Sequence, residues 1–564
     1  MPDDGFPPFS AAARHEHLRS LPGESWDLLV IGAGITGAAA ARDAAGRGLR
    51  VALVDAGDVG RGTSSASSRL IHGGIRYLET FEFRLVFEAS AERRRLLGLA
   101  SHLVHPLPFL FPVYRGGPVG FRKLQAGMWL YDGLSLFRNI ARHRMLPRAR
   151  LREEEPGLRT EGLVGAARYF DASVDDARLT LANARGAHEA GAAVVPHAAV
   201  VGFLRNGDSL AGARVRDCLL PDAEPVEVRA RVVINATGPW CDSVRKLADP
   251  RVAPRLRPTK GVHLVVPRER IGNRNAVTFR SPVDGRVMFV LPWGKFSYVG
   301  TTDTDFTGSP AEVRADADDV AYLLASANGI FPDAKLTESD VVSTWAGVRP
   351  LLAPHKGAGD GLTASATSRE HEIWRDPGGL LNIGGGKLTT YRVMARQLVD
   401  RAVRELKPHG VQAGMSPTAH LPLPGDPREP WEAFRERLVG EAVAAGLGAD
   451  TGEHLARAYG EDADAILAAA RGDASLASRL MEGHPYITAE VVHAVRAEMA
   501  LSLDDVLVRR LHLFYEAMDG GLAVAERVAR TMAAQEGIGW SAAQVAFQVE
   551  AYRKAVEATR GFGG

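Results

Sequence analysis

The sequence predicts an α/β protein in which a Rossmann-like dinucleotide-binding unit is interleaved with a β-sheet-rich second part and followed by an all-helical domain. Three observations predict this fold class. Residues 26–55 have the pattern of a strand, a glycine turn, a helix and a second strand. Short apolar runs alternate with turns between about 160 and 420. From about 425 onward, Ala-rich segments with helical periodicity are separated by Gly and Asp.

Composition narrows the function classes before any motif is considered. The 564 residues are 46% hydrophobic and 24% charged, as in globular proteins of several domains, which excludes a disordered or fibrous chain. The formal net charge of +1 provides no basic field for nucleic acid. Two cysteines are too few for a disulfide framework. We therefore expect a cytoplasmic protein with no nucleic-acid partner.

Two common catalytic patterns are missing from the sequence. The 17 histidines form neither an HExxH motif nor a cluster with cysteine, so we expect no metal site. No GxSxG nucleophile elbow is present, which argues against a serine hydrolase.

The strongest motif is Gly32-x-Gly34-x-x-Gly37, at the junction of the first strand and the helix. Glycines at these positions permit a tight turn and let a pyrophosphate approach the backbone amides at the helix amino end. Asp55 ends the second strand, where a carboxylate can accept hydrogen bonds from an adenosine ribose. The unit therefore predicts binding of a dinucleotide.

Two later segments indicate a flavin rather than a nicotinamide. Residues 232–238 read as a buried strand that runs into a Thr-Gly turn, so a second strand end can pack beside the dinucleotide. Residues 383–390 place three glycines before a helix whose positive amino end would stabilise charge on the pyrimidine edge of a reduced flavin. Either segment alone is more often an ordinary turn. Together with the first unit they resemble the FAD-dependent oxidoreductases of the amino-acid oxidase type.

Seven short segments narrow this resemblance to one family, the aerobic, quinone-linked, FAD-dependent glycerol-3-phosphate dehydrogenases. The segments are TSSASSRLIHGGIRYLE (63–79), DDARL (175–179), NATGPW (235–240), GTTD (300–303), GVRPL (347–351), GGKLTTY (385–391) and DDVLVRR (504–510). They occur in order over most of the chain. The departures are minor: Asp55 stands where relatives often have Glu, and Arg69 where some have Lys.

The resemblance implies a division of the chain into domains. An FAD-binding portion would consist mainly of residues 25–95, 165–240 and 360–400, and a substrate portion mainly of 96–164 and 241–359, both within 25–424. Residues 425–564 would form the helical carboxyl-terminal domain. Residues 1–24 are Pro-rich, without the pattern of a secretion signal, so we expect them to be a mobile segment. A homodimer is one arrangement that the sequence leaves open.

The resemblance also implies which residues bind the cofactor, as noncovalent FAD. These residues lie in the first glycine motif, in the segment that follows the second strand, and in the two later turns. They are Gly32, Gly34, Gly37, Asp55, Thr63, Ser64, Ser65, Ser68, His72, Val200, Thr237, Gly238, Gly385, Lys387, Leu388 and Thr389.

The substrate site is predicted from charge and hydrogen-bonding capacity together with the family motifs. A phosphate dianion is held best by guanidinium groups and hydroxyl donors, which favours Arg76 and Arg349. Tyr77, beside the first of these, and Thr302 complete the predicted substrate contacts.

Three side chains are candidates for the catalytic groups. His263 and His72 are the candidates for accepting the hydroxyl proton, because imidazole titrates near neutral pH, and we favour His263. Lys387 is expected either to polarise the developing ketone or to contact the flavin. The sequence does not separate these two roles.

The implied reaction is oxidation of sn-glycerol 3-phosphate to dihydroxyacetone phosphate, with electrons passed through FAD to a membrane quinone. One alternative is an oxidase that uses O2 and makes H2O2. A flavoenzyme for another hydroxy or amino compound would give the phosphate-binding arginines no purpose. A flavin-binding sensor, the third alternative, would need none of the proton-handling groups.

A basic segment bears on the electron acceptor. Residues 119–152 contain eight Lys or Arg and one acid, with apolar side chains at helical spacing and Trp129 near their edge. One interpretation is a helix that docks on an anionic membrane through cations such as Arg138, Arg142 and Arg144. The other is a helix packed on its own domain with a solvated charged face. The resemblance favours the first, a peripheral protein on the inner face of the cell membrane.

Overall fold

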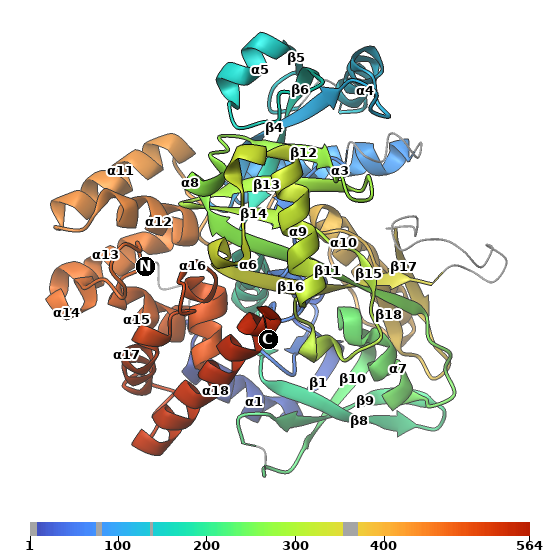
Figure 1. Cartoon of the computed structure of the whole chain (residues 1–564). Coiled ribbons are helices and arrows are strands. Elements are labelled where there is room, and N and C mark those ends of the chain that lie inside the picture. Colours follow the sequence, from blue (N-terminus) through green and yellow to red (C-terminus); the bar gives the residue numbers. More distant parts are fainter. Residues whose placement is uncertain (1–7, 75–81, 136–138, 221, 354–369, 564) are drawn as a thin grey trace.

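The computed structural model describes residues 8–74, 82–135, 139–220, 222–353 and 370–563. Within them the chain forms an eight-stranded sheet, a ten-stranded sheet and a group of helices that begins after residue 430. Figure 1 shows these late helices, coloured orange to red, gathered along one side of both sheets. The predicted fold class is confirmed.

The eight-stranded sheet is built around the predicted dinucleotide-binding unit. Its order is β17-β18-β10-β1-β2-β7, with the hairpin β8-β9 attached to β10, and the strands from β18 to β7 are parallel. The bounds are β1 Ser25–Ile31, β2 Val51–Val54, β7 Ala193–Val195, β8 Ala198–Asn206, β9 Ser209–Asp217, β10 Val226–Asn235, β17 His371–Arg375 and β18 Leu381–Gly385.

Beside this sheet, helix α2 (Ile35–Ala45) contacts two others, α6 (Asp176–Glu189) and α10 (Tyr391–Leu406). Alanines of α2 share a buried core with the valines and leucines of β1 and β2. Alanine has no χ angle to order and suits a helix that must lie close to a sheet. The core therefore fixes the helix that follows the glycine turn.

Part of the amino-terminal segment is helical, which corrects the expectation of a mobile region over residues 1–24. α1 (Ala11–Ser20) begins at Ser10, whose side chain accepts a hydrogen bond from the Ala13 amide. Arg14 is fully buried and donates to both carboxylate oxygens of Asp217, at 2.6 and 3.0 Å. This partner is 203 residues away, so local sequence could not reveal it.

The ten-stranded sheet forms the other half of the body. Its order is β15-β11-β14-β13-β12-β4-β6-β3, with β16 paired to β11 and β5 to β6. The bounds are β3 Leu70–Ile71, β4 Val104–Tyr114, β5 Arg144–Pro147, β6 Leu163–Val174, β11 Leu256–Pro267, β12 Ala276–Arg280, β13 Val287–Trp293, β14 Phe296–Gly300, β15 Thr304–Asp305 and β16 Ser343–Leu352. Helix α9 (Ala317–Ile330) packs on it through Val320, Leu323 and Ala327.

The basic segment 119–152 is not one helix. α4 (Phe121–Leu134) is followed by β5 and the short helix α5 (Arg148–Glu154). The predicted apolar face of α4 is used within the protein, because Leu124, Met128 and Tyr131 are buried in its core. Figure 1 shows α4 and α5 at the end of the molecule farthest from α18.

The late part of the chain is helical. Its elements are α11 (Trp431–Ala444), α12 (Ala449–Tyr459), α13 (Ala463–Gly472), α14 (Ala474–Ala477), α15 (Thr488–Ala497), a π-helical turn (Asp505–Arg510), α16 (Leu513–Glu516), α17 (Leu522–Ala533) and α18 (Ala542–Arg560). One buried core is internal to this group. A second joins α15, α17 and α18 to the ten-stranded sheet.

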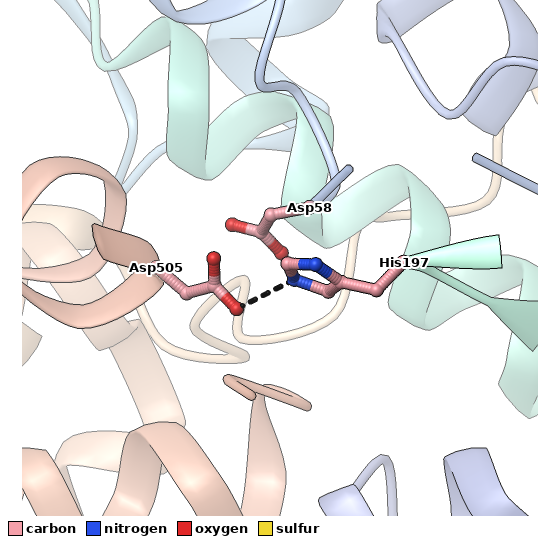
Figure 2. Close-up of side chains that lie close together, drawn as sticks. All are labelled: Asp58, His197 and Asp505. Atoms are coloured by element: carbon pink, nitrogen blue, oxygen red, sulfur yellow. Dashed lines mark hydrogen bonds and ion pairs between the residues drawn. The ribbon is translucent and has the colours of Figure 1, made fainter. Parts of the chain in front are cut away.

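A buried ionic network joins the helical group to the dinucleotide-binding unit. Asp58, four residues after β2, accepts hydrogen bonds from Arg509 at 2.5 Å and from Arg510 at 2.7 and 3.1 Å. Arg509 also donates to Asp505, and His197 lies 3.0 Å from the same carboxylate. Figure 2 shows the imidazole of His197 facing the carboxylates of Asp58 and Asp505, with its hydrogen bond to Asp505 drawn as a dashed line.

These three residues, Asp58, His197 and Asp505, lie close enough to serve as metal ligands, with ligand atoms within 4.8 Å of one another. Their oxygens already accept from two guanidinium groups, and Asp505 also accepts from the Leu501 and Ser502 amides. Two arginine charges occupy the position that a cation would take. We therefore interpret the cluster as an ionic cross-link between domains.

Replacing Asp58 with Ala should destabilise the protein by about 3–5 kcal/mol, because it removes the carboxylate that two buried arginines share. Urea unfolding followed by tryptophan fluorescence measures this loss. Glu526→Ala is the matched control: it breaks an exposed ion pair with Arg530, 2.7 Å long, and should cost less than about 0.5 kcal/mol. Equal stability of the two variants would contradict the cross-link.

Candidate active site

The glycine turn after β1 is as tight as the motif predicts. Gly32 has φ +103°, and a Cβ built on it would lie 2.7 Å from the Ala236 carbonyl oxygen. A Cβ on Gly37 would lie 1.8 Å from the carbonyl oxygen of Gly32. Side chains at both positions are therefore excluded. The close approach brings the end of β10 against the amino end of α2, as expected for a dinucleotide cradle.

Asp55 is fixed beside this turn. Its carboxylate accepts from the Ala33 amide at 2.6 Å and from the Gly57 amide at 2.8 Å. Burial raises the pKa of its carboxyl above the ordinary value, although both amides oppose this. At the amino end of α2, Ser64 Oγ accepts from the Ile35 amide at 2.9 Å, and the N-cap residue Gly34 has no side chain of its own to offer.

The turn after β10 is held by a buried asparagine. The Thr237 hydroxyl donates to the Asn235 side chain at 2.7 Å, and Asn235 in turn donates to Asn382 on β18 at 2.9 Å. Gly238 takes φ +54°. Val200 lies on β8 and packs on the apolar core beside β1 and β2.

The second glycine loop leads into α10 and contacts the segment of His72. Gly385 has φ +72°, and a Cβ there would lie 2.5 Å from the Glu370 carbonyl oxygen. Lys387 and Leu388 begin a short 3₁₀ turn before the helix. The Thr389 hydroxyl accepts from the His72 amide at 3.1 Å and donates to its carbonyl at 3.3 Å. These contacts place His72 beside the loop.

Arg349 lies on β16, opposite Thr259 of β11. Its guanidinium donates to Asp303 at 3.1 Å and to the Thr301 hydroxyl at 2.9 Å. It crosses over Gly261, where a Cβ would lie 2.3 Å from it. The side chain is 19% exposed. Its charge is therefore oriented by these hydrogen bonds and can still contact a ligand.

His263 lies on the same face of the sheet. Its ring stacks on Trp345 with centroids 4.9 Å apart, and Nε2 is 2.9 Å from the Ser68 hydroxyl. Gly300 is required opposite it, since a Cβ there would lie 2.0 Å from the ring. Burial, together with the charges of Arg349 and Arg69, holds the pKa of His263 well below its ordinary range. The imidazole is therefore neutral at neutral pH.

Residues 63–68 connect the two sheets. The Thr63 hydroxyl donates to the Val348 carbonyl on β16 at 2.6 Å, and Ser68 contacts His263 on β11. Ser65 is buried, and its hydroxyl reaches the Gly62 carbonyl at 3.5 Å. Several residues predicted to bind the cofactor thus also hold the loop against the strands that carry Arg349 and His263.

The other predicted substrate residues are placed differently. Thr302 is buried, and its hydroxyl accepts from the Val262 amide at 3.0 Å, so it holds the strand β11. Arg76 and Tyr77 lie outside the described residues. The sequence reasoning did not assign roles to Asp303, Thr301 or Trp345. The sequence did contain a signal for Asp303 and Thr301, because both belong to the GTTD motif.

Comparison with known proteins identifies the family. The model of the FAD-dependent oxidoreductases matches residues 27–401, and the model of the C-terminal domain of alpha-glycerophosphate oxidase matches residues 416–545. Glycerol-3-phosphate dehydrogenase 2 of Mycobacterium tuberculosis (strain ATCC 25618 / H37Rv) is 40% identical over 551 residues, which cover 97% of this chain and 91% of that protein. The chain belongs to the FAD-dependent glycerol-3-phosphate dehydrogenase family.

Two further relatives agree with the family. Aerobic glycerol-3-phosphate dehydrogenase of Staphylococcus haemolyticus is 37% identical over 504 residues, 88% of each chain. The X-ray structure of glycerol-3-phosphate dehydrogenase from Bacillus halodurans, complexed with FAD, is 30% identical with a TM-score of 0.80 over 99% of each chain. The predicted family, enzyme class and cofactor are confirmed.

The geometry fits FAD on grounds independent of the comparisons. The glycine turn leaves no room for side chains where a pyrophosphate would approach, and Asp55 is fixed at its edge. The loop 385–389 precedes α10, whose amino end points a positive dipole toward the same region. The individual residue assignments remain predictions.

Proposed function

We propose that this protein oxidises sn-glycerol 3-phosphate to dihydroxyacetone phosphate. The supporting observation is the placement of Arg349 and a neutral His263 on one face of paired strands, joined by residues 63–68 to the dinucleotide cradle. An anion holder and a proton acceptor are the two groups that a phosphorylated alcohol requires. The names of the relatives give the same substrate.

FAD, when bound, supplies the acceptor for the C2 hydride. His263 takes the hydroxyl proton, because its ring is neutral and, among the described residues, its Nδ1 forms no hydrogen bond. His72 is the second candidate, positioned by Thr389 beside the glycine loop. Arg349, oriented by Asp303 and Thr301, holds the phosphate together with Arg76 and Tyr77.

Lys387 completes the proposed site. It stands at the start of the turn before α10, where its ammonium either polarises the developing ketone or contacts the flavin. Gly32, Gly34, Gly37, Asp55 and the residues of the second loop hold FAD without a covalent bond.

Anaerobic addition of glycerol 3-phosphate should bleach the yellow protein. A flavin sensor, or an enzyme for amino compounds, would stay yellow under the same conditions.

Acid precipitation of the unreacted protein should leave the flavin in the supernatant, and a yellow pellet would contradict the noncovalent assignment.

Replacing Arg349 with Ala should lower kcat/KM for glycerol 3-phosphate by about tenfold to more than a hundredfold. The change removes a charge-assisted hydrogen bond of about 1.5–3 kcal/mol. Steady-state kinetics measures the effect. Arg257→Ala, which breaks an ion pair between β11 and Asp305 of β15, is the matched control and should leave kcat/KM unchanged. An unaltered Arg349→Ala enzyme would remove this residue from the site.

Replacing the proton acceptor should slow flavin reduction by about 100-fold or more, since general base catalysis contributes at least that much. Rapid mixing of FAD-loaded His263→Ala and His72→Ala with substrate measures the rate for each. We expect the larger loss in His263→Ala. Wild-type reduction rates in that variant would transfer the role to His72.

The electron acceptor that we propose is a quinone in the membrane, reached by peripheral docking. Among the described residues no helix is both long and apolar enough to span a bilayer. Exposed apolar side chains lie on two helices in contact, α3 (Phe83–Leu99) and α4. They are Phe83, Phe87, Trp129 and Leu130, exposed by 38–52%, and the same helices carry the exposed cations Arg84, Arg122 and Lys123. Aromatic groups beside cations favour an anionic membrane surface.

Phe87→Ser combined with Trp129→Ser should reduce binding to vesicles of phosphatidylcholine and phosphatidylglycerol at least tenfold, on the basis of about 1.5–3 kcal/mol for a buried apolar side chain. Flotation measures the bound fraction. Binding should also weaken with salt, because charge attraction is screened within about 8 Å at physiological ionic strength. Phe547→Ser, 69% exposed on α18, is the control.

Two results would move the assignment to a soluble oxidase that makes H2O2. One is equal recovery on purely neutral vesicles for the wild type and the double variant. The other is faster turnover with oxygen than with a short-chain quinone.

A further inference from the structure

A large cavity that the proposed reaction does not use lies between the ten-stranded sheet and the helical group. Its volume is about 690 Å3, within the range of about 300–1,000 Å3 for small-molecule sites. One wall is the hairpin β13–β14, with Trp293, Phe296 and Tyr298. The opposite wall is formed by the late helices and loops, including Tyr486 and His512.

Arg69 lines this cavity as a buried cation whose side chain lacks hydrogen-bond partners in the part of the chain that the structure describes. It is 4% exposed, and its guanidinium carbon lies 4.3 Å from the Trp293 ring centroid and 4.9 Å from that of Trp345. Among the described residues no acceptor forms a hydrogen bond with its side chain. Its Nε is fully buried and has no hydrogen-bond partner within these residues. A buried guanidinium with unused donors requires an explanation.

The nearby carboxylates do not provide one. Asp176 is 3.8 Å from Arg69 Nε, beyond hydrogen-bonding distance, and its own oxygens accept from the Ser67 hydroxyl and amide at 2.6 and 3.0 Å. Asp175 is 2.5 Å from His512 Nε2. Both acids balance the charge of Arg69 from a distance, while its donors stay available to a ligand in the cavity.

Two more cations stand at the rim on the same wall. Lys295, in the turn of the hairpin, donates to the Gly483 carbonyl at 2.7 Å, and the Arg268 amide donates to the Lys295 carbonyl at 2.9 Å. In the described part of the chain neither side chain pairs with a carboxylate. Of the acids on the helical side of the cavity, Asp450 and Glu453 are paired with other arginines at 2.6 and 2.7 Å, and Glu516 accepts from the Tyr486 hydroxyl at 2.9 Å. The sheet wall is therefore net positive.

We propose that this cavity binds a small organic anion whose phosphate or carboxylate accepts hydrogen bonds from Arg69 and whose planar or apolar part lies against Trp293 and Phe296. The aromatic wall suits a ring, and the guanidinium fork suits a planar or tetrahedral anion. Arg69 and His263 lie on the same Trp345 ring, the first at 4.9 Å and the second stacked at 4.9 Å. The Trp345 ring therefore contacts both Arg69 of the cavity and the proposed proton acceptor.

Calorimetric titration of the FAD-loaded protein with phenyl phosphate, and in parallel with benzoate, tests the site. The Arg349→Ala background removes the competing anion holder of the proposed active site. We expect saturable binding of at least one probe in that background. Adding Arg69→Gln should weaken it by about tenfold or more, as expected for loss of a charge-assisted hydrogen bond.

A rim variant and its control keep the test decisive if Arg69→Gln fails to fold. Lys295→Glu reverses an exposed charge at the rim and should weaken binding about tenfold, by the usual size of an interfacial charge reversal. Arg270→Gln is the matched control, on the same short helix as Arg268 but paired with Asp340 and not part of the cavity wall. It should leave binding unchanged.

Three outcomes would overturn the proposal: no binding of either probe, equal binding to Lys295→Glu and wild type, or binding that disappears with Arg349→Ala alone. The last result would place the probe in the proposed substrate site. Because the readout is binding rather than turnover, an error in the proposed reaction leaves this test intact.

Discussion

The architecture depends on the buried ion pairs between Asp58 and the two arginines Arg509 and Arg510. Asp58 stands three residues after Asp55, in a loop that also holds the glycine turn, since the Gly60 amide donates to the Ala33 carbonyl at 3.0 Å. Burying a charge costs free energy unless a partner of opposite charge lies close to it. The contact between Asp58 and the two arginines therefore has few alternative geometries. The helical domain is consequently fixed to the loop that shapes the edge of the dinucleotide cradle.

A second constraint acts through residues 63–69, which lie between the cradle and the ten-stranded sheet. Thr63 bonds to β16, Ser68 to His263, and Asp176 accepts from Ser67. One short segment thus sets the distance between the cofactor side and the strands that carry the anion holder and the proposed base. A shift of this loop would move both halves of the site relative to each other, and small displacements of reacting groups are expensive in rate.

Sequence patterns predicted the structure formed by residues close together in the chain. They did not predict contacts between residues far apart in the chain. The glycine turn, Asp55 and the second glycine loop follow from strand, turn and helix signals within a few residues. The burial of Arg14 could not be predicted, because Asp217 approaches it only in the folded sheet. The partner of the apolar face on the basic segment could not be predicted for a related reason: Leu124 and Met128 have the spacing of an amphipathic face, and spacing alone does not distinguish a membrane from the protein's own core.

The family motifs divide into two physical roles that sequence alone does not separate. The residues of GTTD and GVRPL surround Arg349, whereas those of DDARL and DDVLVRR meet at the domain boundary. Asp175 contacts His512, Arg178 donates to Glu498 at 2.7 Å, and Arg510 reaches both Asp58 and the Glu498 carbonyl. Charged residues are seldom fully buried unless they are paired, so each of these motifs needs the other domain to be stable. The helical domain is therefore part of the frame that holds the site, and a motif far from the chemistry can be as restricted in sequence as one that touches the substrate.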